Sequence, residues 1–232
     1  MPIPPLPRPR PERVVLEGRY ARLEPLDPGR HATALHAATF GGDVEARLRY
    51  VPAVPAEPAP FRVWLDGAAA SEDPLHFAVI DLASDRCEGR QALMRIVPDH
   101  GVVEVGHILW GPAIARTRVA TEALALVAAY AFDALGYRRL EWKCDARNTP
   151  SRRAAARFGF AYEGTFRQHM VTQGRNRDTA WFALLDHEWP PRRAALDAWL
   201  DPANFDPDGR QRMALARGAS AGDGSHAIPS SP

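Results

Sequence analysis

A helix-forming run from Ala120 to Leu135 constrains the fold of this chain more than any other segment. The run is apolar on most of its faces, so it has to be covered on several sides, as a helix that crosses over a β-sheet is. Gly136 follows its last residue, in the place where a left-handed cap ends a helix. Strand-like segments lie both before and after the run. A crossover helix between strands makes neighbouring strands parallel, so the run predicts a mixed α/β sheet.

The segments before this helix predict an antiparallel arrangement. Residues 14–26 indicate a first strand pair or one bent strand around a glycine turn, and Asp27 then caps a helix that begins at Pro28. Two further helical pieces or irregular arms follow, up to about residue 70. Three strands of a meander come next, at residues 75–82, 90–97 and 102–110.

The segments after the helix alternate between strand and helix. A strand runs from Arg138, and a short helix follows it and ends at Gly159. Two strands joined by a turn at Gly174 form a hairpin. A last helix starts at a proline. No internal repeat and no second domain are evident, so we expect residues 13–202 to form a single domain.

Both ends of the chain have a composition that differs from that of the domain. Residues 1–12 contain six prolines and little that can be buried, so we expect a disordered, extended arm. Residues 203–232 form a C-terminal extension that is rich in Gly, Ala, Ser and Pro from about Arg217, and we expect most of it to be disordered.

The overall composition excludes several classes of protein. Hydrophobic residues make up 46% and charged residues 25%, which is too apolar for a disordered chain. The balance of 29 basic against 28 acidic residues argues against nucleic-acid binding. No apolar stretch is long enough for a membrane helix, and the N-terminus lacks the apolar core of a signal peptide. Because Cys87 and Cys144 indicate free thiols in a reducing compartment, we expect a cytoplasmic protein.

Three segments carry a specific resemblance. The junction ARTRVATEA, the helix NTPSRRAAARFGF and the hairpin FRQHMVTQGRNRDTAWF resemble the GNAT superfamily of acyl-CoA N-acyltransferases. Within it the chain is most similar to the ribosomal-protein N-terminal acetyltransferases RimJ and RimL, over about residues 14–189. This resemblance implies the GNAT fold, a mostly antiparallel sheet of six to seven strands flanked by helices, with a V-shaped gap between the fourth and fifth strands. It also implies acetyl-CoA as the co-substrate, with no metal.

The phosphate-binding loop departs from the family pattern. The family usually has Gln/Arg-x-x-Gly-x-Gly/Ala, whereas residues 115–120 read ARTRVA. The loop offers backbone N–H groups to a pyrophosphate at a helix N-terminus, and glycine helps the backbone to approach closely. Arg116 and Arg118 do this less freely, although their charge can attract phosphates. The residues that the resemblance implies for CoA are Ala115, Arg116, Thr117, Arg118, Val119 and Ala120 on this loop, and Ile108, Leu109 and Trp110 along the pantetheine arm.

The strand at residues 102–110 carries two titratable groups. Period-two alternation places Glu104 and His107 on opposite faces unless a bulge intervenes. A carboxylate on an apolar strand is the better candidate for the general base that deprotonates the amine, through a water, and the alternative is an ion pair with an arginine at the sheet edge. His107 either lines the acceptor pocket or is a packed histidine.

Polar residues after the next strand are further candidates. By resemblance, Ser151 is a catalytic candidate that protonates the leaving thiolate, and Asn148 and Ser151 contact CoA. The alternative for both is helix capping. The hairpin indicates either the wall of an acceptor pocket or an exposed, salt-bridged surface. Its pocket candidates are Arg167, His169, Asp178 and Trp181.

The sequence thus predicts an acetyltransferase that acts on a primary amine, either a small molecule or a protein N-terminus. Direct attack is favoured, since neither cysteine has an adjacent histidine that would suggest a nucleophile. Two alternatives remain open at this stage: a non-catalytic acyl-CoA-binding module, and a transferase of succinyl or longer acyl groups. A homodimer is expected only by analogy.

Overall fold

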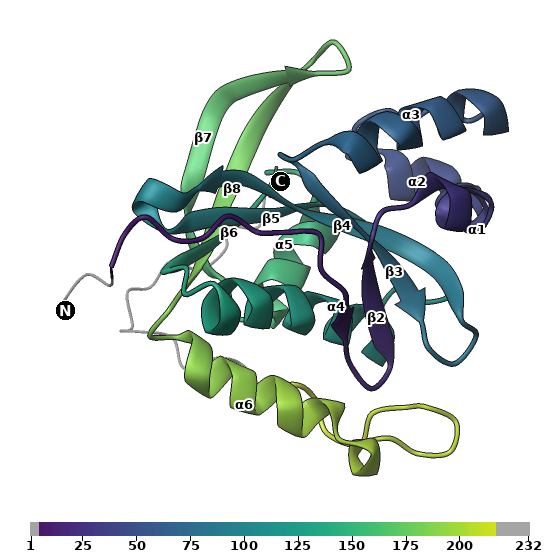
Figure 1. Ribbon diagram of the computed structural model, residues 1–232. Helices are drawn as coiled ribbons and strands as arrows, with labels where there is room; N and C mark the ends of the chain where they lie inside the picture. The colour runs from purple at the N-terminus through teal and green to yellow at the C-terminus, as the bar shows by residue number, and fades with distance from the viewer. Residues whose placement is uncertain (1–4, 217–232) are drawn as a thin grey trace.

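The computed structural model describes residues 5–216, and Figure 1 shows a central sheet with helices on both faces. The sheet has eight strands in the order β1-β2-β3-β4-β5-β6-β8-β7. The strands are β1 (Leu16–Glu17), β2 (Ala21–Pro25), β3 (Leu75–Asp81), β4 (Arg86–Val97), β5 (Val102–Trp110), β6 (Arg139–Asp145), β7 (Ala161–Thr172) and β8 (Arg175–Leu185). The helices are α1 (Pro28–Phe40), α2 (Val44–Leu48), α3 (Pro58–Ala70), α4 (Arg118–Ala129), α5 (Thr149–Arg157) and α6 (Trp189–Leu200).

The topology confirms the mixed, mostly antiparallel sheet that the sequence predicts. Every pair of neighbouring strands is antiparallel except β5 and β6, which α4 connects as a crossover helix. Residues 14–26 form the strand pair β1 and β2 rather than one bent strand, which is why the sheet has eight strands and not six or seven. None of the helices in the described part of the chain is long and apolar enough to cross a membrane.

The parallel pair β5 and β6 is incomplete. Only residues 102–104 of β5 are paired with β6, where they face residues 139–141. From Val105 onward β5 has no partner on this side, so its backbone N–H and C=O groups along that edge belong to no ladder. This is the strand separation that the resemblance implies, and it follows the fourth strand if the two-residue β1 is not counted.

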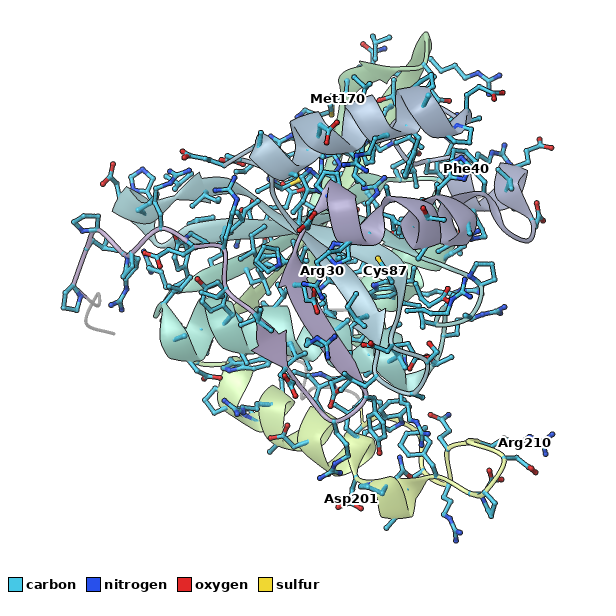
Figure 2. The ribbon with its side chains drawn as sticks, turned by 45° about the vertical axis from the view of Figure 1, so that its right-hand side comes forward. Arg30, Phe40, Cys87, Met170, Asp201 and Arg210 are labelled. Atoms are coloured by element: carbon cyan, nitrogen blue, oxygen red, sulfur yellow. The ribbon has the colours of Figure 1, made fainter. Side chains whose placement is uncertain are left out.

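Two hydrophobic layers fix the sheet between its helices. On one face α4 and α6 cover β4, β5, β6 and β8, with Ala123, Leu124 and Val127 of α4 fully or nearly fully buried. On the other face α1 and α3 cover β3 and the start of β4, and Figure 2 shows this layer above Cys87. The helices of this second layer do not extend over β6 to β8.

The first turn of α4 is attached to the β1–β2 turn through Glu122. Its buried carboxylate accepts hydrogen bonds from the backbone N–H groups of Arg19, Tyr20 and Ala21, at 2.9, 2.5 and 2.7 Å. A Cβ at Gly18 would lie 2.4 Å from the carboxyl carbon, so only glycine fits there. Glu122 therefore joins two elements that are distant in sequence, a role beyond the stabilisation of the helix dipole.

The described parts of the two termini contact the domain. The N–H of Arg8 donates to the carbonyl of Pro98, and the N–H of Glu12 donates to the hydroxyl of Tyr130. Near the other end, Phe205 is 8% exposed and packs edge-on against Trp199. Residues 1–4 and 217–232 of the predicted disordered ends lie outside the described residues.

Candidate active site

A β-bulge interrupts β5 beside the point where β6 leaves it. The register passes from Ala92↔Gly106 to Arg90↔Leu109. Between these two pairs the chain advances by three residues on β5 but by only two on β4. His107 takes up the extra residue with a φ of +50°. A bulge of this kind bends the strand and turns a side chain to the other face.

The sequence places Glu104 and His107 on opposite faces unless a bulge intervenes, and the structure has that bulge. His76 is paired with Ala92, which in turn is paired with Gly106, so His76 projects from the same face as Gly106 and Glu104. The rings of His76 and His107 lie 5.1 Å apart. His107 therefore shares the face of Glu104, because the extra residue shifts the alternation by one position.

A buried arginine donates a hydrogen bond to the backbone of the bulge. Arg90 is 1% exposed, and its Nη1 donates to the carbonyl oxygen of His107 at 2.9 Å. Its guanidinium carbon lies 4.9 Å from the centre of the Trp64 ring. Burial lowers the pKa of Arg90 to about 10, so the guanidinium remains charged at neutral pH. Arg90 is not among the residues that the sequence predicts for the site.

The two histidines on this face are neutral at physiological pH. Burial, together with the nearby His107 and Arg90, lowers the pKa of His76 to about 3. Burial and Arg90 lower the pKa of His107 to about 4. A neutral imidazole can accept a proton or a hydrogen bond, so His107 provides an acceptor beside the bulge.

Glu104 lies at the last pair between β5 and β6, within a buried charge cluster. Its Oε2 is 3.0 Å from Nζ of Lys143 and 3.1 Å from Nε of Arg95. Lys143 also contacts Glu141 at 2.7 Å. Burial raises the pKa of Glu104, and the positive charges of Lys143 and Arg95 oppose the increase. The ion-pair alternative is thus observed, within a cluster that is largely buried.

The β7–β8 hairpin brings aromatic side chains to the same cluster. Nζ of Lys143 lies 3.9 Å above the ring of Trp181, whose Nε1 is buried without a partner in residues 5–216. The Phe166 and His169 rings pack against Trp181 at 4.6 and 5.8 Å. His169 also bonds the hydroxyl of Thr179 at 2.9 Å.

The other two predicted hairpin residues lie apart from this cluster. Arg167 is exposed. Asp178 accepts hydrogen bonds from the N–H of Gln168 and the side-chain amide of Asn176. Only His169 and Trp181 of the predicted hairpin set therefore belong to this cluster.

The loop from β5 to α4 presents free backbone donors. Thr117 caps the helix by accepting from the N–H of Val119, and its hydroxyl donates to the carbonyl of Ile114. Within the described chain, the N–H groups of Arg116, Arg118 and Ala120 have no hydrogen-bond partner. Three such donors at the start of a helix favour an anion there.

The two arginines of this loop behave differently from each other. Arg116 is exposed and adopts a φ of +65°, although its position in the family pattern is not a glycine position. Arg118 has an ordinary helical position, and its guanidinium stacks on the rings of Tyr20 and Phe205 at 4.4 and 5.3 Å. Arg118, at the glycine position of the family pattern, thus fits without a positive φ, and the backbone strain of the loop lies at Arg116.

The remaining predicted residues for CoA lie along β5 and at the start of α5. Ile108 and Trp110 contact the α4 side of the core, and Leu109 is buried. The predicted capping role of Asn148 is confirmed, because its side chain accepts from the N–H of Ser151. The Ser151 hydroxyl accepts from Nε1 of Trp142 at 3.0 Å and also forms a hydrogen bond with Cys144.

Neither thiol has the environment of a nucleophile. Burial raises the pKa of Cys87 to about 12 and also raises the pKa of Cys144, with the latter increase opposed by a hydrogen bond with Ser151. A thiol becomes reactive when its pKa is lowered. Within residues 5–216, no group of three or more His, Cys, Asp or Glu residues is placed to hold a metal ion.

Comparison with known proteins places this arrangement in a family. Residues 21–161 match the model of the acetyltransferase (GNAT) domain. A crystal structure of a GCN5-related N-acetyltransferase from Brucella melitensis is 57% identical, with a TM-score of 0.89, and the match covers 90% of this chain and 96% of that one. An uncharacterized N-acetyltransferase p20 from Bacillus licheniformis is 30% identical over 117 residues, which are 49% of this chain and 63% of that protein.

Ribosomal-protein acetyltransferases share the fold at a greater distance. The crystal structure of ribosomal-protein-S5-alanine acetyltransferase from Vibrio fischeri is 16% identical, with a TM-score of 0.58, and the match covers 77% of this chain and all of that one (100%). At this identity the likeness extends to the fold alone.

Proposed function

The chain belongs to the GNAT family of N-acetyltransferases, and on that premise we propose that it transfers the acetyl group of acetyl-CoA directly to a primary amine. The observation that carries the proposal is the free edge of β5, which leads from the bulge to the open N–H groups at the start of α4. An edge of this kind pairs with an extended amide-containing chain, and the helix start accommodates a pyrophosphate. Acetyl-CoA has both parts in one molecule.

In the proposed mechanism Glu104 accepts the proton of the amine through a water molecule. Its side chain is 6% exposed and contacts Lys143, which lies against the ring of Trp181. Backbone N–H groups at the bulge stabilise the charge that develops on the thioester oxygen. Ser151 returns a proton to the leaving thiolate, which is compatible with the hydrogen bond that it accepts from Trp142.

Direct transfer is preferred over an acyl-enzyme intermediate. The raised pKa values of Cys87 and Cys144 keep both thiols protonated at neutral pH, and both side chains are buried. An acyl-cysteine route would need an exposed thiolate. The amine therefore attacks the thioester carbon without an intermediate carrier.

The acceptor is proposed only as a class. A small amine and a protein N-terminus, the latter as in the ribosomal-protein acetyltransferases, both remain within the proposal. A cytoplasmic location and a homodimer are retained from the sequence and from analogy. The alternatives are a module that binds acyl-CoA without transferring it and an enzyme that prefers succinyl or longer acyl groups.

The test is amine-dependent release of free CoA thiol by the purified full-length chain. Acetyl-CoA, succinyl-CoA and a longer acyl-CoA are each offered with a panel of small amines and peptides, and mass spectrometry identifies the acylated product. We expect release with acetyl-CoA only when an amine is present. Binding of acetyl-CoA with no release from any amine would support the non-catalytic module instead.

A further inference from the structure

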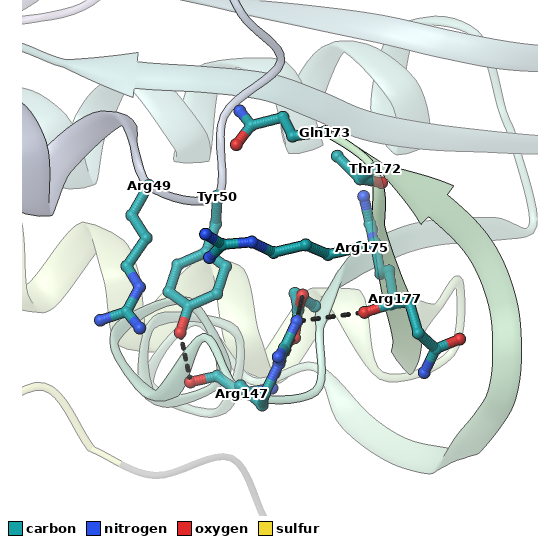
Figure 3. Close-up of a pocket in the computed structure, with 9 residues that line it drawn as sticks. Arg49, Tyr50, Arg147, Thr172, Gln173, Arg175 and Arg177 are labelled. Atoms are coloured by element: carbon teal, nitrogen blue, oxygen red, sulfur yellow. Dashed lines mark hydrogen bonds and ion pairs between the residues drawn. The ribbon is translucent and has the colours of Figure 1, made fainter.

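An arginine-rich pocket lies where three separate segments meet. Figure 3 shows Arg49 and Tyr50 after α2, Arg147 in the loop after β6, and Arg175 and Arg177 on the β7–β8 hairpin. The full lining is Arg49, Tyr50, Asp145, Arg147, Thr172, Gln173, Arg175, Asn176 and Arg177.

The pocket has an excess of positive charge. Its only acidic lining residue, Asp145, is already held by Arg147, whose Nε and Nη2 lie 3.2 and 3.1 Å from the two carboxylate oxygens. Across residues 5–216, Arg49, Arg175 and Arg177 form no ion pair with any carboxylate. The Nε of Arg177 is also buried without a hydrogen-bond partner. Unpaired guanidinium groups around one hollow favour an oxyanion.

Hydrogen bonds connect the segments that form the pocket. The Tyr50 hydroxyl donates to the carbonyl of Arg147 at 3.3 Å, and the side chain of Gln173 donates to the carbonyl of Val51 at 3.4 Å. Arg147 also donates to the carbonyl of Asn176 at 3.2 Å. In Figure 3 the side chain of Arg175 extends across the pocket toward Tyr50. These hydrogen bonds join the segment after α2 to the hairpin and to the loop after β6, so they fix the relative positions of the segments that line the pocket.

The pocket lies at the end of the strand separation. Asp145 is four residues beyond Glu141, the last β6 residue paired with β5, which corresponds to about 13 Å along the strand. On β5 the bulge lies between Gly106 and Leu109, about 7 to 16 Å beyond Glu104 along that strand. On the β5 side, Arg47 of α2 donates to the carbonyl of Trp110. This hydrogen bond holds α2, and with it the segment of Arg49 and Tyr50, beside the end of β5. The pocket therefore lies beyond the end of the pairing, on the β6 side of the separation.

We propose that this pocket binds a carboxylate or phosphate group of the acceptor, so that the acceptor is an amine that also carries an acid group. This inference rests on the proposed transferase function, because it assigns the substrate class of the same site. The guanidinium groups attract such a molecule and orient its amine toward the bulge. They repel polyamines and other purely cationic amines, which should be poor acceptors.

The first experiment compares acceptors that differ in one group. In the carboxylate pair, glutamate is compared with glutamate diamide, which lacks the carboxylates. In the phosphate pair, phosphoethanolamine is compared with ethanolamine, which lacks the phosphate. O-phosphoserine, which carries both acid groups, is a further acceptor. We expect kcat/KM to fall about tenfold or more when the acid group is removed. The ratio between the carboxylate and the phosphate pair identifies which oxyanion the pocket prefers. Equal rates within both pairs would overturn the proposal.

The second experiment removes the arginines. Arg49→Ala and Arg175→Ala should each raise the KM of the acid-bearing acceptor about tenfold, while kcat and the Kd for acetyl-CoA stay unchanged. The control is Arg62→Ala, because Arg62 is an exposed residue of α3 outside the pocket that pairs with Asp66. A loss of acetyl-CoA affinity with unchanged acceptor KM would instead assign the pocket to the phosphates of the co-substrate, and would contradict the proposal.

A binding measurement separates failure of this proposal from failure of the transferase function. Calorimetry with O-phosphoserine and glutamate, in the absence of acyl-CoA, should detect binding to the wild-type chain that Arg175→Ala abolishes. If no amine is acylated and this binding persists, the transferase function fails and the anion pocket stands. If amines are acylated but no arginine-dependent binding or preference is found, the pocket proposal fails alone.

Discussion

The Nζ atom of Lys143 lies 3.0 Å from Oε2 of Glu104, and both side chains are 6% exposed. Lys143 lies in β6 and Glu104 in β5, at the end of the pairing between the two strands. Burial destabilises the charged carboxylate and raises the pKa of Glu104, whereas Lys143 and Arg95 stabilise the charge. The ion pair thus sets the pH above which the proposed base is ionised.

Replacement of Glu104 by Gln should lower kcat by about 10²- to 10⁴-fold, the range typical of a lost general base. The Kd for acetyl-CoA should remain nearly unchanged, because the proposed CoA contacts lie on the β5 edge and the α4 start. Steady-state kinetics and calorimetry measure the two quantities. The matched control is Glu141→Gln, which removes the other carboxylate that contacts Lys143. An unchanged kcat for Glu104→Gln would exclude Glu104 as the base.

Replacement of Lys143 by Met should move the ascending limb of the pH–rate profile to higher pH. A base must be deprotonated to act, so activity rises as pH passes through the pKa of Glu104, which is already raised. Loss of the buried positive charge raises it further, by about one pH unit or more. Arg95→Met should shift the limb less, because the Arg95 side chain is 48% exposed and its charge is screened by solvent. A limb that does not move in either variant would assign the titration to another group.

Replacement of Arg116 by Gly should relieve strain in the phosphate loop. A non-glycine residue at a φ of +65° costs about 1–2 kcal/mol, of which glycine's greater freedom in the unfolded chain offsets part. We expect Arg116→Gly to be about 0.5–1 kcal/mol more stable than Arg116→Ala, which loses the same charge but keeps the strain. Urea unfolding measures both variants. Equal stability would show that the loop adopts another conformation in solution.

Replacement of Glu122 by Gln should destabilise the fold by about 2 kcal/mol. The carboxylate accepts three backbone N–H groups, and an amide would direct its own N–H donors toward them. Glu17→Gln is the control, because Glu17 is exposed on the neighbouring strand. Denaturant unfolding at neutral pH compares the two. If Glu122→Gln lowers the free energy of unfolding no more than Glu17→Gln does, the β1–β2 turn does not depend on the hydrogen bonds to Glu122.

The sequence predicts the order of elements and the caps because these depend on local patterns. The helix starts at Asp27 and Asn148 carry short side chains that satisfy N–H groups two or three residues ahead, so the structure has both caps where they are predicted. The apolar faces of the crossover helix predict it for the same reason.

The site itself depends on contacts that local patterns do not encode. The bulge at His107 adds one residue to a strand whose alternation looks regular, and its support by Arg90 joins residues 17 positions apart. The cluster around Lys143 requires three strands to be placed side by side. The sequence shows that Lys143 is the one lysine beside 28 arginines, but it does not show that this lysine contacts Glu104.

Calorimetric titration of acetyl-CoA into the wild-type chain, Arg118→Ala and Arg118→Pro tests the binding of the co-substrate most directly. Thr117 is extended, with φ −103° and ψ 177°, so a proline fits at the first position of α4. Both variants lose the arginine side chain, and Arg118→Pro also loses the backbone N–H donor of residue 118. We expect micromolar binding to the wild type, a small change for Arg118→Ala and a loss of about tenfold or more for Arg118→Pro. No heat with the wild type, or equal affinities for the two variants, would contradict the binding of acetyl-CoA through the backbone of this loop.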